Sequence, residues 1–205
     1  MATKELLYYI PAGQYGKEGV LSLLEQHPEI KFVSLVGIDL AGNDTDEKIP
    51  MAAFFDDYEA FFEGRAVQTD GSSVVLTNIA TLNNARVDMW GDPSVNWFVD
   101  YNYENIDEAT GLPTGTLRIP AFLMHNYRYV DSRSILKNSC DYVRAELLSL
   151  IKEHGLPGMP HVKSDDVVDI IFTSATELEF WVKTPSRTVT KKELSVSQKL
   201  QEQYW

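Results

Sequence analysis

The sequence has 205 residues, of which 44% are hydrophobic and 11% aromatic, enough to bury a sizeable core in one domain or in one domain and part of a second. Its 30 acidic residues outnumber its 18 basic ones, and the net charge of −12 repels phosphodiester backbones and anionic headgroups, so no nucleic acid and no membrane partner is expected. A single cysteine, Cys140, excludes an internal disulfide framework, and no secretory leader or run of 18 apolar residues is visible, so we expect a cytoplasmic protein.

The first expected elements are a helix and a strand. Residues 18–26 (EGVLSLLEQ) predict a short helix that ends before Pro28. Its expected buried side consists of Val20, Leu21, Leu23 and Leu24. Residues 30–40 predict a strand whose even positions face the core, with Ser34 as the single interruption. These apolar even positions are Ile30, Phe32, Val36, Ile38 and Leu40.

The next segments predict a second helix and a small sheet. Residues 41–46 have the composition of a turn, and residues 51–63 (MAAFFDDYEAFFE) carry aromatic side chains at helical spacing up to Gly64. We expect those rings to form core packing. Segments 74–79, 85–90 and 96–101, separated by turn signals, are typical of hairpins, so the fold class predicted for this part is α+β.

The clearest helix pattern begins at Asp131 or Ser132 and ends at Gly155. One side is apolar and expected to be buried; it carries Leu136, Cys140, Val143, Leu147 and Leu150. No activating base lies near Cys140 in the sequence, so a packed thiol is favoured over a nucleophile.

The last part of the chain predicts the start of a second domain near residue 131. Segments 167–172 (VVDIIF) and 177–182 (ELEFWV) are predicted strands. Thr190 and Glu193 form a capping box that begins a helix without a stop signal, so we expect the sequence to be a piece of a longer protein.

Two carboxylates on the second predicted strand are candidate metal ligands. Alternate residues of a strand share a face about 6.6 Å apart, which places Glu177 and Glu179 together. Two carboxylates on an apolar strand need solvent, basic partners or cations, and Mg²⁺ or Mn²⁺ prefers oxygen ligands. A solvated strand face or salt bridges would also satisfy them.

A second candidate is the TDGSS segment at residues 69–73, which combines an acidic group, a flexible glycine and two hydroxyls. It is either an ordinary turn or a loop that presents Asp70 to a cation or an amine. Asp88 and the turn at residues 92–94 favour a structural role. The four histidines lack zinc-site spacing, and no phosphate-binding loop motif is present.

Taken in order, these segments resemble glutamine synthetase, the ATP-dependent ligase that joins ammonia to glutamate. The matching stretches are FVSLVGIDLAG (32–42), KIP (48–50), EGRAVQTDGSS (63–73), VDMWGDPS (87–94), DSRSILKNS (131–139) and TELEFW (176–181). The resemblance implies a β-grasp domain in residues 1–130 and the truncated start of an α+β catalytic domain in residues 131–205. It also implies self-association into a ring with active sites between neighbouring subunits.

The resemblance further implies the site residues and the reaction. Glu177 and Glu179 would each ligate one of two divalent cations, and Asp70, with Ser73 beside it, would bind ammonium and take its proton. ATP would phosphorylate glutamate to γ-glutamyl phosphate, which ammonia then attacks. The family's remaining ligands would lie beyond Trp205, so the chain alone is expected to be inactive. The alternatives are a related ligase that uses another amine and a non-catalytic assembly or regulatory module.

Overall fold

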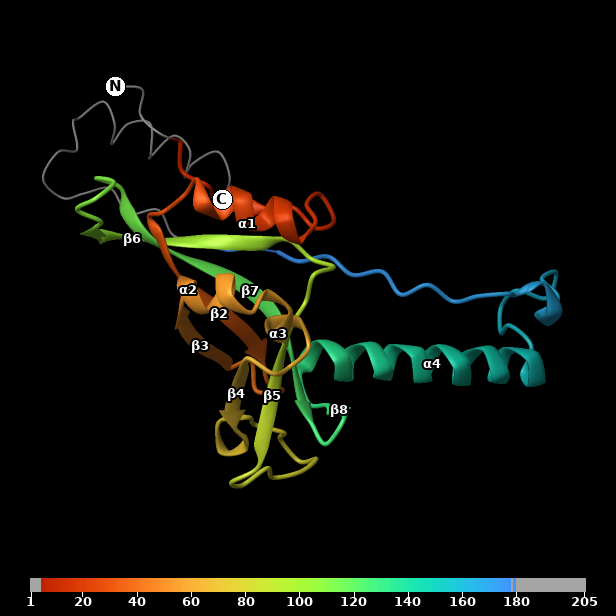
Figure 1. The fold of residues 1–205 in the computed structure, drawn as a ribbon. Coiled ribbons are helices and arrows are strands. Elements are labelled where there is room, and N and C mark those ends of the chain that lie inside the picture. The colour runs from red at the N-terminus through yellow and green to blue at the C-terminus, as the bar shows by residue number, and fades with distance from the viewer. Residues whose placement is uncertain (1–4, 178, 180–205) are drawn as a thin grey trace, which may run out of the picture. The chain divides into compact units, whose positions relative to one another are not determined.

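A computed structural model of the chain describes residues 5–177 and residue 179 (Figure 1). Residues 1–170 form one compact unit. Residues 171–205 form a second unit, in which residues 171–177 and 179 adopt neither helix nor strand. The first unit combines helices with a largely antiparallel sheet, which confirms the predicted α+β class. The predicted domain division at residue 131 stays a prediction.

Within residues 5–170, this unit consists of eight strands, four α-helices and two short 3₁₀ turns. The strands are β1 (Tyr9–Ile10), β2 (Ile30–Ile38), β3 (Asp44–Pro50), β4 (Val67–Asp70), β5 (Arg86–Gly91), β6 (Trp97–Ile106), β7 (Pro113–His125) and β8 (Arg128–Tyr129). The helices are α1 (Lys17–Glu25), α2 (Met51–Asp56), α3 (Tyr58–Phe62) and α4 (Ser132–His154), and the 3₁₀ turns are η1 (Gly71–Ser73) and η2 (Ser164–Asp166).

Strand β7 organises the sheet. The strand order is β1-β6-β7-β2-β3, and β7 also pairs with β5 and β8, while β4 pairs with β5. The β2–β7 pairing is parallel and the other pairings are antiparallel. Along one edge, the neighbour of β7 changes from β6 at Arg118 to β5 at Ala121. Pro120, which has no N–H to donate, lies at this change of partner, where proline is tolerated.

The predicted hairpins are wrong in their pairing. Strands β5 and β6 exist close to their predicted positions, but both pair with β7 rather than with each other. Segment 74–79 forms no strand and contributes only an isolated bridge between Leu76 and Ala80. Residues 44–46, expected to be part of a turn, begin β3, because the strand hydrogen bonds of β2 extend to Asp44.

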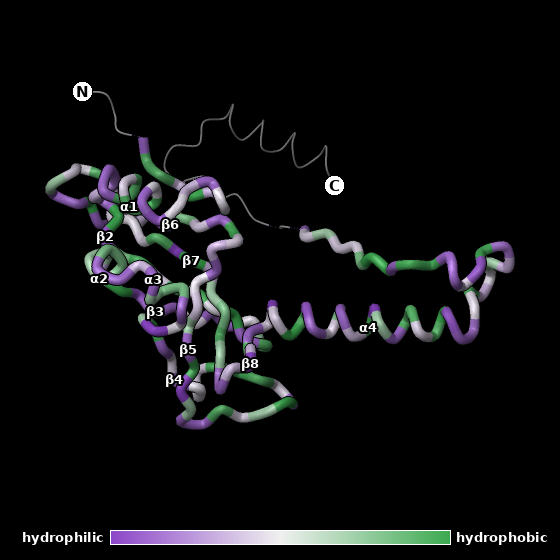
Figure 2. Tube along the Cα trace, turned by 45° about the vertical axis from the view of Figure 1, so that its right-hand side comes forward, coloured by the Kyte–Doolittle hydropathy of each residue, from purple (hydrophilic) through white to green (hydrophobic). Residues whose placement is uncertain are grey.

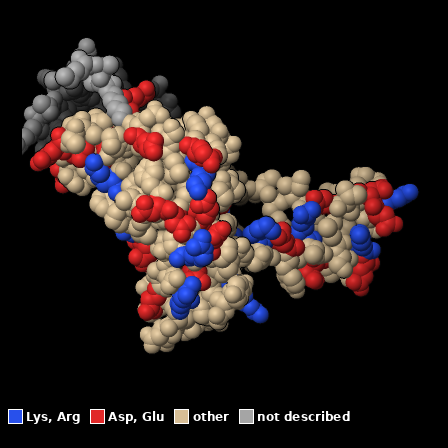
Figure 3. Space-filling model, viewed as in Figure 1, with Lys and Arg blue, Asp and Glu red and all other residues tan. Residues whose placement is uncertain are grey.

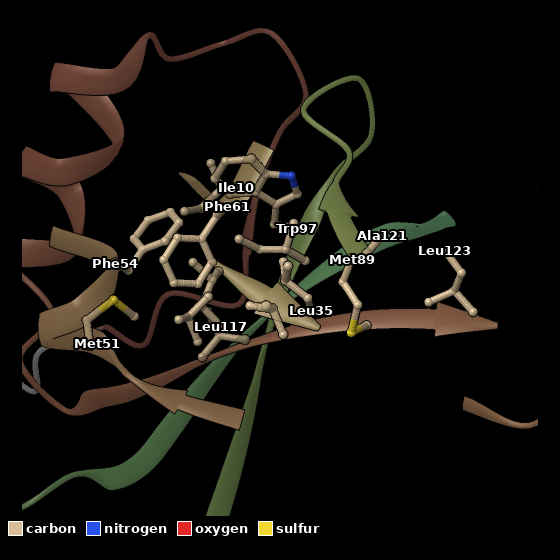
Figure 4. Packing of buried hydrophobic residues seen from close by; sticks show 14 of the residues in the cluster. Ile10, Leu35, Met51, Phe54, Phe61, Met89, Trp97, Leu117, Ala121 and Leu123 are labelled. Atoms are coloured by element: carbon tan, nitrogen blue, oxygen red, sulfur yellow. The ribbon is translucent and has the colours of Figure 1, made fainter. Parts of the chain in front are cut away.

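The strand predicted at residues 30–40 is confirmed as β2. Ile30 is buried as predicted, but after the register shift between Ile30 and Phe32 the buried apolar face is the opposite one. Val33 and Leu35 are fully buried in the core, whereas Phe32, Val36 and Ile38 are only partly buried. The odd positions belong to the same cluster as Phe54 of α2 and Phe61 of α3, shown in Figure 4. On the even side, Val36 and Ile38 line an open apolar pocket of about 270 Å³ with Phe98 of β6 and Pro120 of β7.

Helix α1 forms as predicted, with Val20 and Leu24 buried and Leu21 and Leu23 partly buried against the core. The helix predicted at residues 51–63 is instead two short helices. Asp57 leaves helical geometry at φ −140° and ψ 72°, and its carboxylate caps α3 by accepting a hydrogen bond from the Ala60 N–H at 3.2 Å.

The aromatic side chains of α2 and α3 form core packing, as expected. Phe54 is fully buried, and the centroid of its ring lies 5.0 Å from those of Tyr58 and Phe61. The Phe62 ring stacks on Trp97 at a centroid distance of 5.3 Å, which ties α3 to β6. Such pairs add to the stabilisation from buried area.

Helix α4 begins and ends where the sequence predicts. The Asp131 carboxylate accepts a hydrogen bond from the Ser134 N–H at 2.8 Å, and Gly155 follows the last turn with φ +76°. The prediction of a buried apolar side is wrong for the part of the chain that the structure describes. Leu136 is 65% exposed and Leu150 50% exposed, and Cys140 is only partly buried. Hydrophobic residues recur along α4 between hydrophilic ones (Figure 2). Ser134, in the first turn, is the buried residue of this helix.

The predicted strand at residues 167–172 does not form, because the segment adopts neither helix nor strand. Val168 is 86% exposed and Ile171 81% exposed. An apolar pattern forms a strand only where a neighbouring strand supplies hydrogen bonds, and no described strand pairs with this segment. Glu177 and Glu179 also lie in no strand. Leu178, the rest of the predicted strand at 177–182 and the helix predicted from Thr190 lie outside the described residues.

Candidate functional site

The TDGSS segment folds as the end of a strand followed by a tight turn. Asp70 is the last residue of β4 and pairs with Arg86 of β5. Its carboxylate accepts a hydrogen bond from the Ser72 N–H at 2.7 Å. Backbone and side-chain hydrogen bonds from Ser72 hold the pKa of Asp70 below its ordinary value. Asp70 and Ser73 are both exposed, so the turn presents an ionised carboxylate and a hydroxyl to solvent.

The glycine of this turn is required by close backbone packing. The Gly71 N–H donates to the Ala85 carbonyl oxygen at 2.7 Å. A Cβ atom at residue 71 would lie 2.2 Å from the Leu82 carbonyl oxygen, far inside normal contact. The loop also borders a pocket of about 270 Å³ whose lining includes Thr77 and Asn83.

A buried carboxylate that sequence reasoning missed supports the same loop. Asp39, directly after β2, is fully buried and accepts hydrogen bonds from the Ala41 and Asn43 N–H groups and from the Val75 N–H, each at 2.9 Å. The Asn43 side-chain amide donates a further bond at 3.0 Å. Burial raises the pKa of Asp39, but these hydrogen bonds outweigh it, so the pKa lies below its ordinary value.

Asp92 and Asp88 have structural roles, in agreement with the sequence analysis. Asp92 is buried and accepts hydrogen bonds from Ser94 and from the Arg133 guanidinium. Burial raises the pKa of Asp92, but the hydrogen bonds from Arg133 and Ser94 lower it by more, so the pKa lies below its ordinary value. Because Arg133 also lies 4.7 Å from the centroid of the Phe122 ring, this pair fixes the first turn of α4 to the sheet. Asp88 pairs with Arg86 at 2.6 Å.

Glu177 and Glu179 lie in the second unit, and both are exposed. Within residues 5–177 and 179, no group of three or more His, Cys, Asp or Glu side chains is placed to hold a metal ion. Two carboxylates alone provide fewer ligands than Mg²⁺ or Mn²⁺ requires. The described residues therefore do not fit a complete divalent-cation site.

Acidic side chains are spread over the visible face of the first unit, in keeping with the net charge of −12 (Figure 3). None of the helices that the structure describes is long and apolar enough to cross a membrane.

Comparison with known proteins yields a distant structural likeness. No protein-family model matches the chain, and no curated protein matches it. Among solved structures, a glutamine synthetase from Plasmodium falciparum is similar, with a TM-score of 0.43 and 14% sequence identity over 67% of this chain. The chain spans 24% of the length of that structure.

Proposed function

We propose that the chain is the N-terminal part of an ATP-dependent ligase that forms glutamine from glutamate and ammonia through γ-glutamyl phosphate. The observation that supports this proposal most directly is the state of Asp70. Asp70 is an exposed carboxylate at a tight turn, where it accepts the Ser72 N–H, and as an anion at neutral pH it attracts ammonium; its lowered pKa agrees with this. Because a lowered pKa makes a carboxylate a weaker base, Asp70 is better suited to bind ammonium than to remove its proton.

The proposal assigns residues 1–130 to a β-grasp domain and residues 131–205 to the start of the catalytic domain. The exposed apolar side of α4 fits this division, because such a face is normally buried against the rest of a domain. The whole protein would self-associate into a ring, with glutamate and ammonium as substrates.

Glu177 and Glu179 would supply two carboxylates to divalent cations. Since the described residues do not complete such a site, we assign no metal-dependent or ATP-dependent step to this chain, and it should form no glutamine alone. The metal affinity of the isolated pair should be weak, because two carboxylates leave most coordination positions to water.

Manganese binding measured by calorimetry tests the metal part of the proposal. The wild-type chain should bind Mn²⁺ weakly, and the double variant Glu177→Ala, Glu179→Ala should lose that binding. The double variant Asp165→Ala, Asp166→Ala removes the same charge from two exposed residues and serves as the control. Loss in the control as well, or binding that both variants retain, would show that the two glutamates are not metal ligands.

The ammonium part is tested by titrating the chain with ammonium chloride while the Asp70 carboxylate is followed by NMR, with sodium chloride as the control. A response specific to ammonium supports the proposal. Equal responses to both salts would remove the main reason for assigning ammonium to this turn.

A further inference from the structure

The turn that carries Asp70 is held from two directions by parts of the chain that are distant in sequence. At its start, Asp70 pairs with Arg86, and the Gly71 N–H donates to Ala85 at 2.7 Å. At its end, the Val75 N–H donates to the Asp39 carboxylate at 2.9 Å. The turn is thus anchored at both of its ends by hydrogen bonds within the chain.

The second anchor is a specific arrangement rather than incidental packing. The Leu40 N–H donates to the Val75 carbonyl oxygen at 3.2 Å, so Val75 is bonded through both its N–H and its C=O to the residues after β2. Oδ2 of Asp39 accepts from Val75, while Oδ1 accepts the N–H groups of its own turn, Ala41 and Asn43. One buried carboxylate therefore joins the end of β2 to the segment that follows η1.

The charge of Asp39 suits this role. A buried carboxylate that accepts four N–H bonds is satisfied as an anion, and each bond to a charged acceptor is stronger than one between neutral groups. An asparagine here would offer one acceptor oxygen and an NH₂ group that faces existing donors. The site therefore requires the carboxylate and not only its shape.

We propose that Asp39 is a positioning residue for the Asp70 turn, which sets where Asp70 and Ser73 are presented although it touches neither. The part of this inference that concerns ammonium rests on the proposed function, whereas the positioning itself rests on the hydrogen bonds alone. The path of the turn is thus set by hydrogen bonds to two other parts of the chain.

Backbone amide exchange followed by NMR on the 205-residue chain tests the positioning. In Asp39→Asn, the exchange of the Val75 amide should become at least about tenfold faster, as expected for loss of a bond to a charged acceptor. The pKa of Asp70, measured from its carboxylate resonance, should rise towards its ordinary value as the turn loosens. A merely structural role would destabilise the chain without changing that pKa.

The matched control is Asp131→Asn. Asp131 is equally buried and accepts hydrogen bonds from the Leu123 and Ser134 N–H groups and the Ser134 hydroxyl, but it contacts no residue of the turn. At a pH and temperature where the variant stays folded, it should leave both the Val75 exchange and the Asp70 pKa unchanged. If Asp39→Asn is folded and leaves them unchanged too, the positioning role is wrong.

A measurement on the wild-type chain covers the case in which Asp39→Asn fails to fold. A scalar coupling across the hydrogen bond between the Val75 nitrogen and the Asp39 carboxylate carbon should be detectable, and its absence would overturn the proposal. The outcomes also separate from those of the proposed function. Faster exchange in Asp39→Asn without any ammonium response at Asp70 would keep the positioning role and remove the ammonium assignment.

Discussion

Replacing Gly71 with alanine tests whether the Asp70 turn depends on close backbone packing. The new Cβ would lie 2.2 Å from the Leu82 carbonyl oxygen and 2.7 Å from the Leu82 Cβ. Ordinary contact begins at 3.4 Å, so the two backbone segments must separate by about 1.2 Å. Overpacking of this kind costs about 1 to 3 kcal/mol. Loss of the bond from Gly71 to Ala85 adds about 1 kcal/mol.

The expected loss in the free energy of unfolding is therefore about 2 to 4 kcal/mol, measured by urea denaturation with circular dichroism. Gly16→Ala is the control, because Gly16 has φ −75° and its added Cβ would meet only Glu18 Oε2, at 4.0 Å. That change should cost less than about 1 kcal/mol. Equal stability of Gly71→Ala and the wild type would refute the argument that this turn requires a glycine.

Three further predictions concern the core, the acid limit and α4. Phe54→Ala should cost about 3 to 5 kcal/mol in urea denaturation, because Phe54 is fully buried among aromatic rings; a loss below about 1 kcal/mol would contradict that packing. Asp39 and Asp92 have lowered pKa values in the folded chain, so the stability they contribute is present above their unfolded pKa of about 3.9 and is lost as the pH falls through the lower folded values. The urea concentration at the unfolding midpoint should thus decrease as the pH is lowered below about 4, and this decrease should be less steep in Asp92→Asn. Leu136→Glu should change the free energy of unfolding by at most about 0.5 kcal/mol, because Leu136 is 65% exposed; a loss above about 2 kcal/mol would show that this side of α4 is covered.

Elements with a local signal were predictable from the sequence. Helix α4 has a capping aspartate at one end and Gly155 at the other, and both its ends were predicted. Strand β3 was missed because DTDEKIP is polar and pairs only with β2, at the edge of the sheet. Strand β7 was missed because Pro113 and Pro120 argue against a central strand, although the exchange of neighbours beside Pro120 accommodates it.

The direction in which an element faces depends on its neighbours and was harder to predict. Strand β2 is apolar on both faces, with Val33 and Leu35 on one and Phe32 and Val36 on the other. Period-2 alternation identifies the two faces but not the one that receives the helices.

The same distinction applies to the candidate site. Asp70 lies in a short motif whose residues are contiguous, so the sequence was sufficient to single it out. Asp39 precedes a Gly-Asn turn, which suggests a local hydrogen bond, but its bond to Val75 spans 36 positions. No local pattern indicates a partner at that distance. Glu177 and Glu179 stay predictions as metal ligands.

The central place of β7 has a consequence for the order in which the chain can fold during synthesis. Strand β2 is made early, yet its parallel partner β7 is among the last elements of the sheet to leave the ribosome. Until then β2 and β6 have no strand between them, and their edges are open to pairing with other chains. Contacts so distant in sequence slow folding, so the sheet should be completed only after β7 emerges and joins it.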